Sequence, residues 1–273
     1  MASLMKQRYR DGRSIPDHEI AHIMIALLMA GQHTSSSSTS WVLLHLADRP
    51  DIAYVRLLYI EYRFLTACSS ELLYQEQVEH FGLPGGGFRD MTYEDMRKLL
   101  LLDAVIRETL RMHSPIHSIM RYVRSDLPVP QGLAAPSEDG VYVVPKGYTV
   151  MASPALSQLD PLYWKDANSW DPSRWLDASG FAAQARKQYD ESSKVDFGFG
   201  LVSKGTESPY LPFGAGRHRC IGEQFALLQI GMVIVTMLRK IELRLEGPFP
   251  KPDYTVRLLL WVRVSPSLAD VAC

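Results

Sequence analysis

The stretch Phe213–Gly222, FGAGRHRCIG, places one cysteine among three glycines and three basic residues, directly before an apolar helical run. The chain offers Cys220 only two possible disulfide partners, Cys68 and Cys273, and structural disulfides belong to oxidising compartments. We therefore expect Cys220 to act alone. Unpaired N–H groups at the start of the following helix, together with the neighbouring basic side chains, stabilise a thiolate at this position.

Three chemical uses suit such a thiolate, and one structural use competes with them. It can be a nucleophile with a histidine partner, a redox-sensing thiol, or the single thiolate ligand of a haem iron. The structural alternative is a glycine-bearing turn with an inert cysteine. Gly214, Gly216 and Gly222 remove side chains where the backbone could lie against something large and flat, which favours haem.

The composition indicates a globular protein with a core. The chain has 273 residues, 47% of them hydrophobic and 22% charged, with a formal net charge of -1, enough for one or two domains. No basic stripe suggests nucleic-acid binding. The longest apolar stretch, Ile23–Gly31, is about half of the ~20 residues that a membrane span needs. The polar first residues do not form a signal peptide, so we expect no membrane anchor in this chain.

A long helix is predicted in the first fifth of the chain. Ser14 and Asp17 form a capping box with Pro16 just inside, and apolar residues recur at helical spacing over Ile20–Leu46. The serine-rich segment Ala30–Ser40 would normally suggest a flexible linker, but apolar helical segments flank it. We expect a locally distorted helix there.

Further helices and a small sheet are predicted downstream, with no internal repeats. The fold class is therefore mainly α with small β-sheets. The predicted elements are a short helix opened by the Thr92–Asp95 capping box, a helix over Lys98–His113 stopped by Pro115, short β-prone pieces over Ile116–Val150, a loop-rich stretch Ser153–Pro212, a helix over Ile221–Lys240 and a β-like tail near Thr255–Val264.

The cysteine segment resembles the haem-binding signature of the cytochrome P-450 monooxygenases, F-x-x-G-x-[RH]-x-C-x-G. The resemblance implies that Cys220 is the axial thiolate ligand of the iron, where it favours O–O cleavage, and that His218 bonds a haem propionate. Most members have arginine at that position, whereas sterol-demethylating members have histidine. The cofactor-binding residues implied in this segment are Phe213, Gly214, Gly216, His218, Cys220, Ile221 and Gly222.

Two further motifs extend the resemblance. ETLR places Glu108 and Arg111 one helical turn apart, like the family's E-x-x-R, and WDPSRW resembles the loop whose arginine, Arg174, completes a structural triad. Seen alone, the first two would be an ordinary surface i,i+3 pair. The order of the segments is that of the C-terminal half of the family's fold.

AGQHT resembles the family's [AG]-G-x-[DE]-T on the long helix over the haem. The resemblance implies that Gly31 leaves space beside the iron and that Thr34 offers a hydroxyl to bound dioxygen, with His33 in place of the usual acid. An imidazole can relay protons near neutral pH. Seen alone, His33 would be taken for a satisfied core histidine.

GQHTSSSSTSW, PIHSIMR and the stretch 195–226 are similar to the fungal sterol 14α-demethylases. This resemblance implies haem b, dioxygen, a sterol substrate and electrons from NADPH through NADPH-cytochrome P-450 reductase. It also implies a place on the cytosolic face of the endoplasmic reticulum membrane, through an N-terminal anchor that we expect this chain to lack. Arg121 matches a position that contacts a haem propionate.

Residues 1–273 are interpreted as a single partial domain, the C-terminal half of the fold, from a partial gene model or a truncated copy. Removing about Tyr54–Ser70 restores the family spacing, so we interpret that segment as a retained in-frame intron, in which Cys68 is accidental. The alternative function is a haem-free helical remnant or an interaction module without catalysis.

Overall fold

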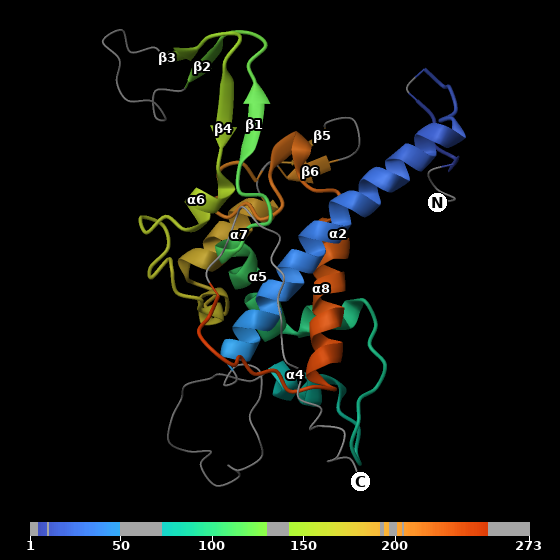
Figure 1. The fold of residues 1–273 in the computed structure, drawn as a ribbon, viewed down its shortest axis with the longest axis vertical. Helices are drawn as coiled ribbons and strands as arrows, with labels where there is room; N and C mark the ends of the chain where they lie inside the picture. The colour runs from blue at the N-terminus through green and yellow to red at the C-terminus, as the bar shows by residue number, and fades with distance from the viewer. Residues whose placement is uncertain are drawn as a thin grey trace. The chain divides into compact units, whose positions relative to one another are not determined.

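The computed structural model describes residues 5–9, 11–49, 73–129, 142–191, 194–196, 201–203 and 205–250 (Figure 1). The predicted insertion and the predicted β-like tail lie outside these residues. The chain divides into two compact units, which we describe separately. Unit 1 comprises Met1–Leu110, Trp170–Leu176 and Cys220–Cys273, and unit 2 comprises Arg111–Ser169 and Asp177–Arg219.

Helix α2 (Asp17–Asp48) in unit 1 runs unbroken through the serine-rich segment, which is therefore not a linker. Hydroxyl groups in that segment bond back to the preceding turn, as when Thr39 Oγ1 donates to the carbonyl of Ser35 at 2.8 Å. The predicted capping box is wrong. Pro16 is the N-cap residue and no side chain caps the helix, because the proline shifts the helix start one residue past itself.

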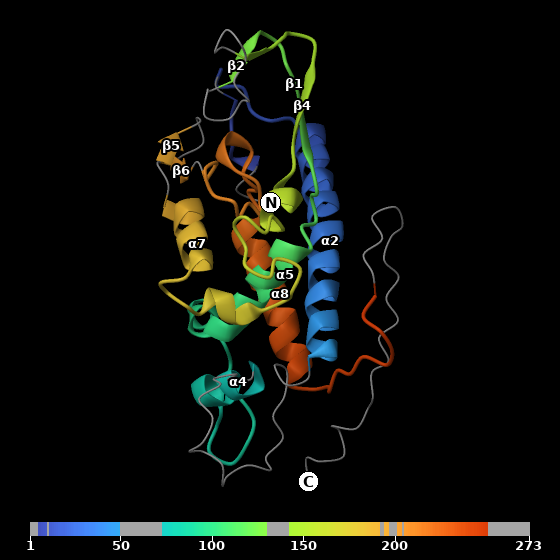
Figure 2. The ribbon, with the colours of Figure 1, turned by 90° about the vertical axis from the view of Figure 1, so that its left-hand side faces the viewer.

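The core of unit 1 lies between α2, α5 (Leu100–Met112) and α8 (Glu223–Leu238), and both views show α2 beside α8 (Figures 1 and 2). Gly231 permits a close approach here, since a Cβ on it would overlap the methyl group of Met96 and lie 3.6 Å from Leu102. Buried apolar residues fill this region: Val42, Leu44, Leu46, Leu102, Val105, Ile106, Leu110, Ile230, Ile234, Val235 and Leu238.

A buried carboxylate from α4 (Leu73–Phe81) holds the start of α5. The Glu76 side chain accepts hydrogen bonds from the backbone N–H groups of Leu101 at 2.6 Å and Leu102 at 3.2 Å. The first N–H groups of a helix have no partners within the helix, and a negative charge there is favourable. Glu76 thus supplies a cap from another element. A 3-10 helix, η1 (Glu94–Lys98), lies between α4 and α5, and Asp95 in it accepts from the Thr92 N–H at 2.9 Å.

The described residues of unit 2 form three antiparallel two-stranded ribbons. In the longest ribbon Ile119 pairs with Ala152 and Tyr122 with Thr149. The elements of this unit are β1 (Ile119–Tyr122) with β4 (Thr149–Ala152), β2 (Leu127–Val129) with β3 (Tyr142–Val144), β5 (Lys194–Asp196) with β6 (Leu201–Ser203), α6 (Pro154–Gln158), α7 (Phe181–Glu191) and η4 (Gly216–His218). The ribbons β1–β4 and β2–β3 confirm the β-prone pieces predicted near Ile116–Val150, whereas β5–β6 lies in the stretch that was expected to be loop-rich.

Large apolar side chains on the first half of α2 are exposed, whereas Trp41, Val42, Leu44 and Leu46 near its end are buried. Leu28 is 68% exposed. Among the described residues, no helix is both long enough and apolar enough to cross a membrane. The large exposed apolar residues of this half are Ile23, Ile25, Leu27, Leu28 and Met29, which are distributed around the helix, and we call them the α2 apolar segment.

Candidate functional site

The loop before Cys220 depends on two glycines for its backbone conformation. Gly214 and Gly216 have φ angles of 70° and 58°, in the left-handed region that side chains disfavour. Gly216 opens the short helix η4. A Cβ on Gly214 would meet nothing nearer than 3.6 Å and one on Gly216 nothing nearer than 3.7 Å, so the backbone conformation, rather than crowding, explains these two glycines.

Cys220 is exposed, with a free thiol, just before the start of α8. Gly222 is the N-cap residue of that helix, and a Cβ there would lie 3.7 Å from Cys220 Sγ, an ordinary contact. Ile221 is 92% exposed and Phe225 is 68% exposed. The cysteine therefore lies in unit 1 near two large apolar side chains that are exposed to solvent.

The three residues predicted to act on dioxygen lie near the middle of α2. Gly31 is exposed, and a Cβ on it would meet no atom within 4 Å. His33 is exposed, so it is not a core histidine. The half-buried Thr34 donates its hydroxyl proton to the Ala30 carbonyl at 2.8 Å, which leaves the lone pairs of its oxygen as acceptors.

Glu108 is fully buried and joins α5 to the WDPSRW segment within unit 1. Its Oε1 accepts from the Asp171 N–H and from Arg174 Nε, each at 3.0 Å, and its Oε2 accepts from Trp175 Nε1 at 2.9 Å. The alternative of a surface i,i+3 pair is therefore wrong. The 3-10 helix η3 (Pro172–Trp175) carries the arginine and the tryptophan. Sequence reasoning missed Trp175, although a tryptophan needs a partner for its N–H when it is buried.

Arg111, also fully buried, binds backbone carbonyl groups of unit 2. Its guanidinium donates to Gln158 O and Ala167 O, each at 2.8 Å, and lies 5.2 Å from the ring centre of Trp164. Gln158 donates in return to Arg111 O at 3.0 Å and accepts from the Leu211 N–H at 2.9 Å. Gln158 therefore links the end of α5 to the approach to the cysteine loop, a role that no motif signalled.

His113, just after α5, is held neutral. Burial of the imidazole, reinforced by the nearby charge of Arg111, lowers its pKa to about 4. Such a histidine is a structural group near neutral pH rather than a proton carrier.

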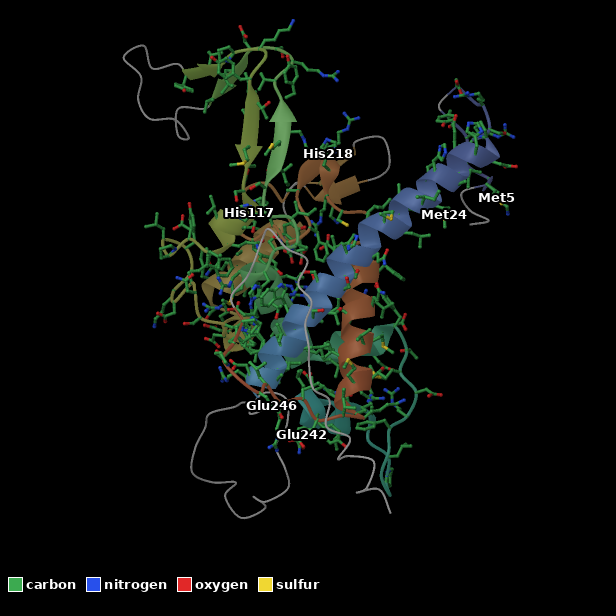
Figure 3. All side chains as sticks on the ribbon, in the orientation of Figure 1. Met5, Met24, His117, His218, Glu242 and Glu246 are labelled. Atoms are coloured by element: carbon green, nitrogen blue, oxygen red, sulfur yellow. The ribbon has the colours of Figure 1, made fainter. Side chains whose placement is uncertain are left out.

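The two residues predicted to bond haem propionates are exposed in unit 2. Figure 3 shows His218 on η4. Arg121 lies on β1 opposite Val150, and its Nη1 donates to the Met120 carbonyl at 2.8 Å. Both side chains offer N–H donors to an anion.

Within the described part of the chain, no group of three or more His, Cys, Asp or Glu side chains could hold a metal ion. One exposed thiol with apolar neighbours instead fits an iron whose other ligands come from a bound macrocycle. Gly31, His33, Thr34, Glu108, Arg174, Cys220, Ile221 and Gly222 belong to unit 1, and Arg111, Arg121, Phe213, Gly214, Gly216 and His218 belong to unit 2.

Comparison with known proteins decides the family. The sequence model of the family "Cytochrome P450" matches residues 1–54 and 71–266. The chain belongs to the cytochrome P450 family. The match leaves out residues 55–70 and includes both the α2 motif and the cysteine loop.

The similar curated proteins are fungal sterol demethylases. The chain is 49% identical over 266 residues to a lanosterol 14-alpha demethylase of Mycosarcoma maydis, covering 95% of this chain and 44% of the relative. It is 44% identical over 258 residues to a sterol 14-alpha demethylase of Aspergillus fumigatus, and 46% identical over 258 residues to an eburicol 14-alpha-demethylase of Uncinula necator. Each of these alignments covers 93% of this chain and 44% of the relative. The chain thus spans less than half the length of these relatives.

The fold agrees with the family. The solved structure of the retinoic acid-bound cyanobacterial CYP120A1 superposes with a TM-score of 0.63 at 23% identity, over 89% of this chain and 44% of that chain. The mainly helical architecture with small antiparallel ribbons is therefore that of part of a cytochrome P450 fold, as the sequence predicted.

Proposed function

We propose that this chain carries the thiolate-ligand half of a haem monooxygenase that removes the 14α-methyl group of sterols. The single observation that carries the proposal is the exposed Cys220 thiol just before α8, with the exposed side chains of Ile221 and Phe225 near it in unit 1. The names of the similar fungal proteins support the sterol substrate.

The chain's own residues divide the work as follows. Cys220 holds the iron as a thiolate, and His218 and Arg121 bond the propionates. Gly31, on which a Cβ would meet no atom within 4 Å, would leave space for the haem. His33, exposed and titratable, delivers protons, and the Thr34 oxygen accepts a hydrogen bond from the group that carries the proton. Glu108, Arg111 and Arg174 hold the surrounding segments in place.

When bound, haem b supplies the chemistry of dioxygen activation, in which one oxygen atom enters a C–H bond and the other leaves as water. The two electrons for each such step come from NADPH through NADPH-cytochrome P-450 reductase. By the same resemblance, the complete enzyme works on the cytosolic face of the endoplasmic reticulum membrane. The interpretation of Tyr54–Ser70 as an insertion also stays a proposal, supported by the family match that omits residues 55–70.

The test is the absorption spectrum of the haem-loaded chain after reduction and treatment with carbon monoxide. A thiolate-ligated ferrous haem gives the long-wavelength band that names the family. We expect this band in the wild type and in Cys273→Ser, and its loss in Cys220→Ser. A wild-type chain that binds no haem would favour the haem-free interaction module, and a Cys220→Ser variant that keeps the band would refute Cys220 as the ligand.

A further inference from the structure

Arg219, the residue before Cys220, is anchored to the C-terminal end of α7. Its Nη1 donates to the Tyr189 carbonyl at 2.9 Å and its Nη2 to Asp190 Oδ1 at 3.2 Å, and its guanidinium carbon lies 3.8 Å from the centre of the Tyr189 ring. Charge-assisted hydrogen bonds from the planar guanidinium, together with its stacking on the tyrosine ring, fix both the position and the plane of the guanidinium. Arg219 is thus turned toward α7.

Tyr189 holds the other end of the same loop. Its side chain is fully buried, and its hydroxyl donates to the Gly214 carbonyl at 2.9 Å. One tyrosine therefore contacts both ends of residues 214–219. These contacts all lie within unit 2.

The segment leading to the loop is fitted against the same helix. Ser208 Oγ donates to the Ala185 carbonyl at 2.8 Å. A Cβ on Gly205 would lie 3.0 Å from the Tyr189 ring, so a larger residue would press on the tyrosine. The loop therefore packs against α7. The polar sequence of this helix gave little indication that it supports the loop.

The three basic residues of the loop have different roles. Arg217 and His218 are exposed, whereas Arg219 is half-buried under the contacts with Tyr189 and Asp190. An anion that approaches the loop from solvent meets the first two. The guanidinium of Arg219 instead binds groups of the protein, Tyr189 and Asp190. Arg219 therefore influences the position of Cys220 through the backbone that joins the two residues.

We propose that Tyr189, Asp190 and Arg219 form an anchor that fixes the backbone of residues 214–219 and thereby positions Cys220 as an iron ligand. The inference rests on the proposed haem-thiolate function. A loop with two left-handed glycines has few restraints of its own, and a ligand must be held within about 0.5 Å by the residues around it. The three residues are positioning residues, since none of them would touch the iron.

The first test follows the loop without haem. Hydrogen–deuterium exchange of the full chain reports on the loop amides, where the Gly214 N–H bonds Leu211 O and the Arg219 N–H bonds Gly216 O, each at 3.1 Å. Tyr189→Phe removes one hydrogen bond and keeps the ring, so we expect exchange at these amides to rise about fivefold. Arg219→Lys should act in the same direction, while the amides of the β1–β4 ribbon stay unchanged.

The matched controls are Tyr148→Phe, a tyrosine that is 62% exposed, and Arg244→Lys, an arginine whose side chain is 74% exposed. Neither should alter exchange in the loop. Unchanged exchange in both Tyr189→Phe and Arg219→Lys, or a rise of equal size in the β1–β4 ribbon, would overturn the anchor. The second outcome would show a general loss of stability.

The second test uses the chain loaded with haem, reduced and treated with carbon monoxide. Tyr189→Phe and Arg219→Lys should bind haem but give the thiolate band in a fraction at least twofold smaller than the wild type. Equal fractions in wild type and variants would contradict the positioning role. If the wild type itself shows no thiolate band, the proposed function fails, and the exchange experiment still decides whether the anchor holds the loop.

Discussion

Glu108 and Arg111 are one helical turn apart, and both side chains are fully buried. Glu108 collects the N–H donors of residues 171–175, and Arg111 donates to the carbonyl groups of Gln158 and Ala167. A buried carboxylate needs donors and a buried guanidinium needs acceptors. The E-x-x-R spacing thus gives one helix two anchors of opposite polarity.

At the same scale, His113 makes stability depend on pH. Its pKa is about 4 in the folded chain and about 6.5 in an unfolded one. Between these values the unfolded state binds more protons, so the free energy of unfolding falls as the pH drops from about 7 to about 4, by roughly 3 kcal/mol, and His113 adds no further loss below that. Urea unfolding at several pH values measures the slope.

The variant His113→Asn should remove this part of the pH dependence. Carboxylates titrate in the same range, so the comparison that matters is with His18→Asn, which alters an exposed histidine and should keep the wild-type slope. Identical slopes in the wild type and both variants would show that His113 is not held neutral by the fold.

At the scale of elements, the sequence predicted those helices whose apolar residues recur at a regular spacing. The helices α5 and α8 were expected from recurring apolar residues and lie within two residues of the expected bounds. The helix α7 was missed because its buried face consists of Ala182, Ala185 and Tyr189, too few large apolar side chains to give a periodic signal.

Contacts between distant segments could not be predicted in the same way. The hydrogen bond from Trp175 to Glu108 joins residues 67 positions apart, and the cap from Glu76 to Leu101 spans 25 positions. No local propensity encodes such pairs, since they form only when tertiary packing brings the segments together. The motifs predicted the residue types of the site, whereas only the structure supplies the partners that hold them.

A prediction at this scale concerns the link between α5 and η3. Glu108→Gln keeps the shape of the side chain but replaces the buried carboxylate, 3.0 Å from the Arg174 guanidinium, with a neutral amide. Breaking a buried ion pair costs about 3 to 5 kcal/mol, so we expect a loss of that order in the free energy of unfolding, measured with urea. Haem incorporation should fall with it.

The control for this change is Glu242→Gln, in the segment after α8. Glu242 pairs with Arg244 at 2.6 Å, and the two side chains are 27% and 74% exposed, so the loss of this charge should cost less than about 1 kcal/mol. Equal effects of the two variants would mean that the Glu108 pair contributes no more than a surface contact.

At the scale of the whole molecule, exposed apolar surface is the feature that we expect to control solubility. The α2 apolar segment, and Ile221 and Phe225 near the start of α8, present large side chains to solvent within unit 1. Contiguous apolar patches on soluble proteins usually mark sites that something else covers. The chain spans 44% of the length of its sterol demethylase relatives, whose remaining residues are available for that purpose.

We therefore predict that the 273-residue chain, expressed alone, is poorly soluble and does not demethylate sterols even with the reductase. Exposed apolar side chains drive association. Because Cys220, Ile221 and Phe225 are exposed, a haem bound to Cys220 would be open to water, which weakens the electrostatic control that oxygen chemistry needs. Size-exclusion chromatography and binding of a hydrophobic dye test the association, and turnover of lanosterol with the reductase tests the activity.

Replacing Leu28 and Met29, both in the α2 apolar segment, with lysine should raise solubility, whereas the same change at Leu83 and Leu100, which are exposed elsewhere, should do so less. A monomeric wild-type chain that turns over lanosterol would show that α2 and α8 suffice to enclose the reaction.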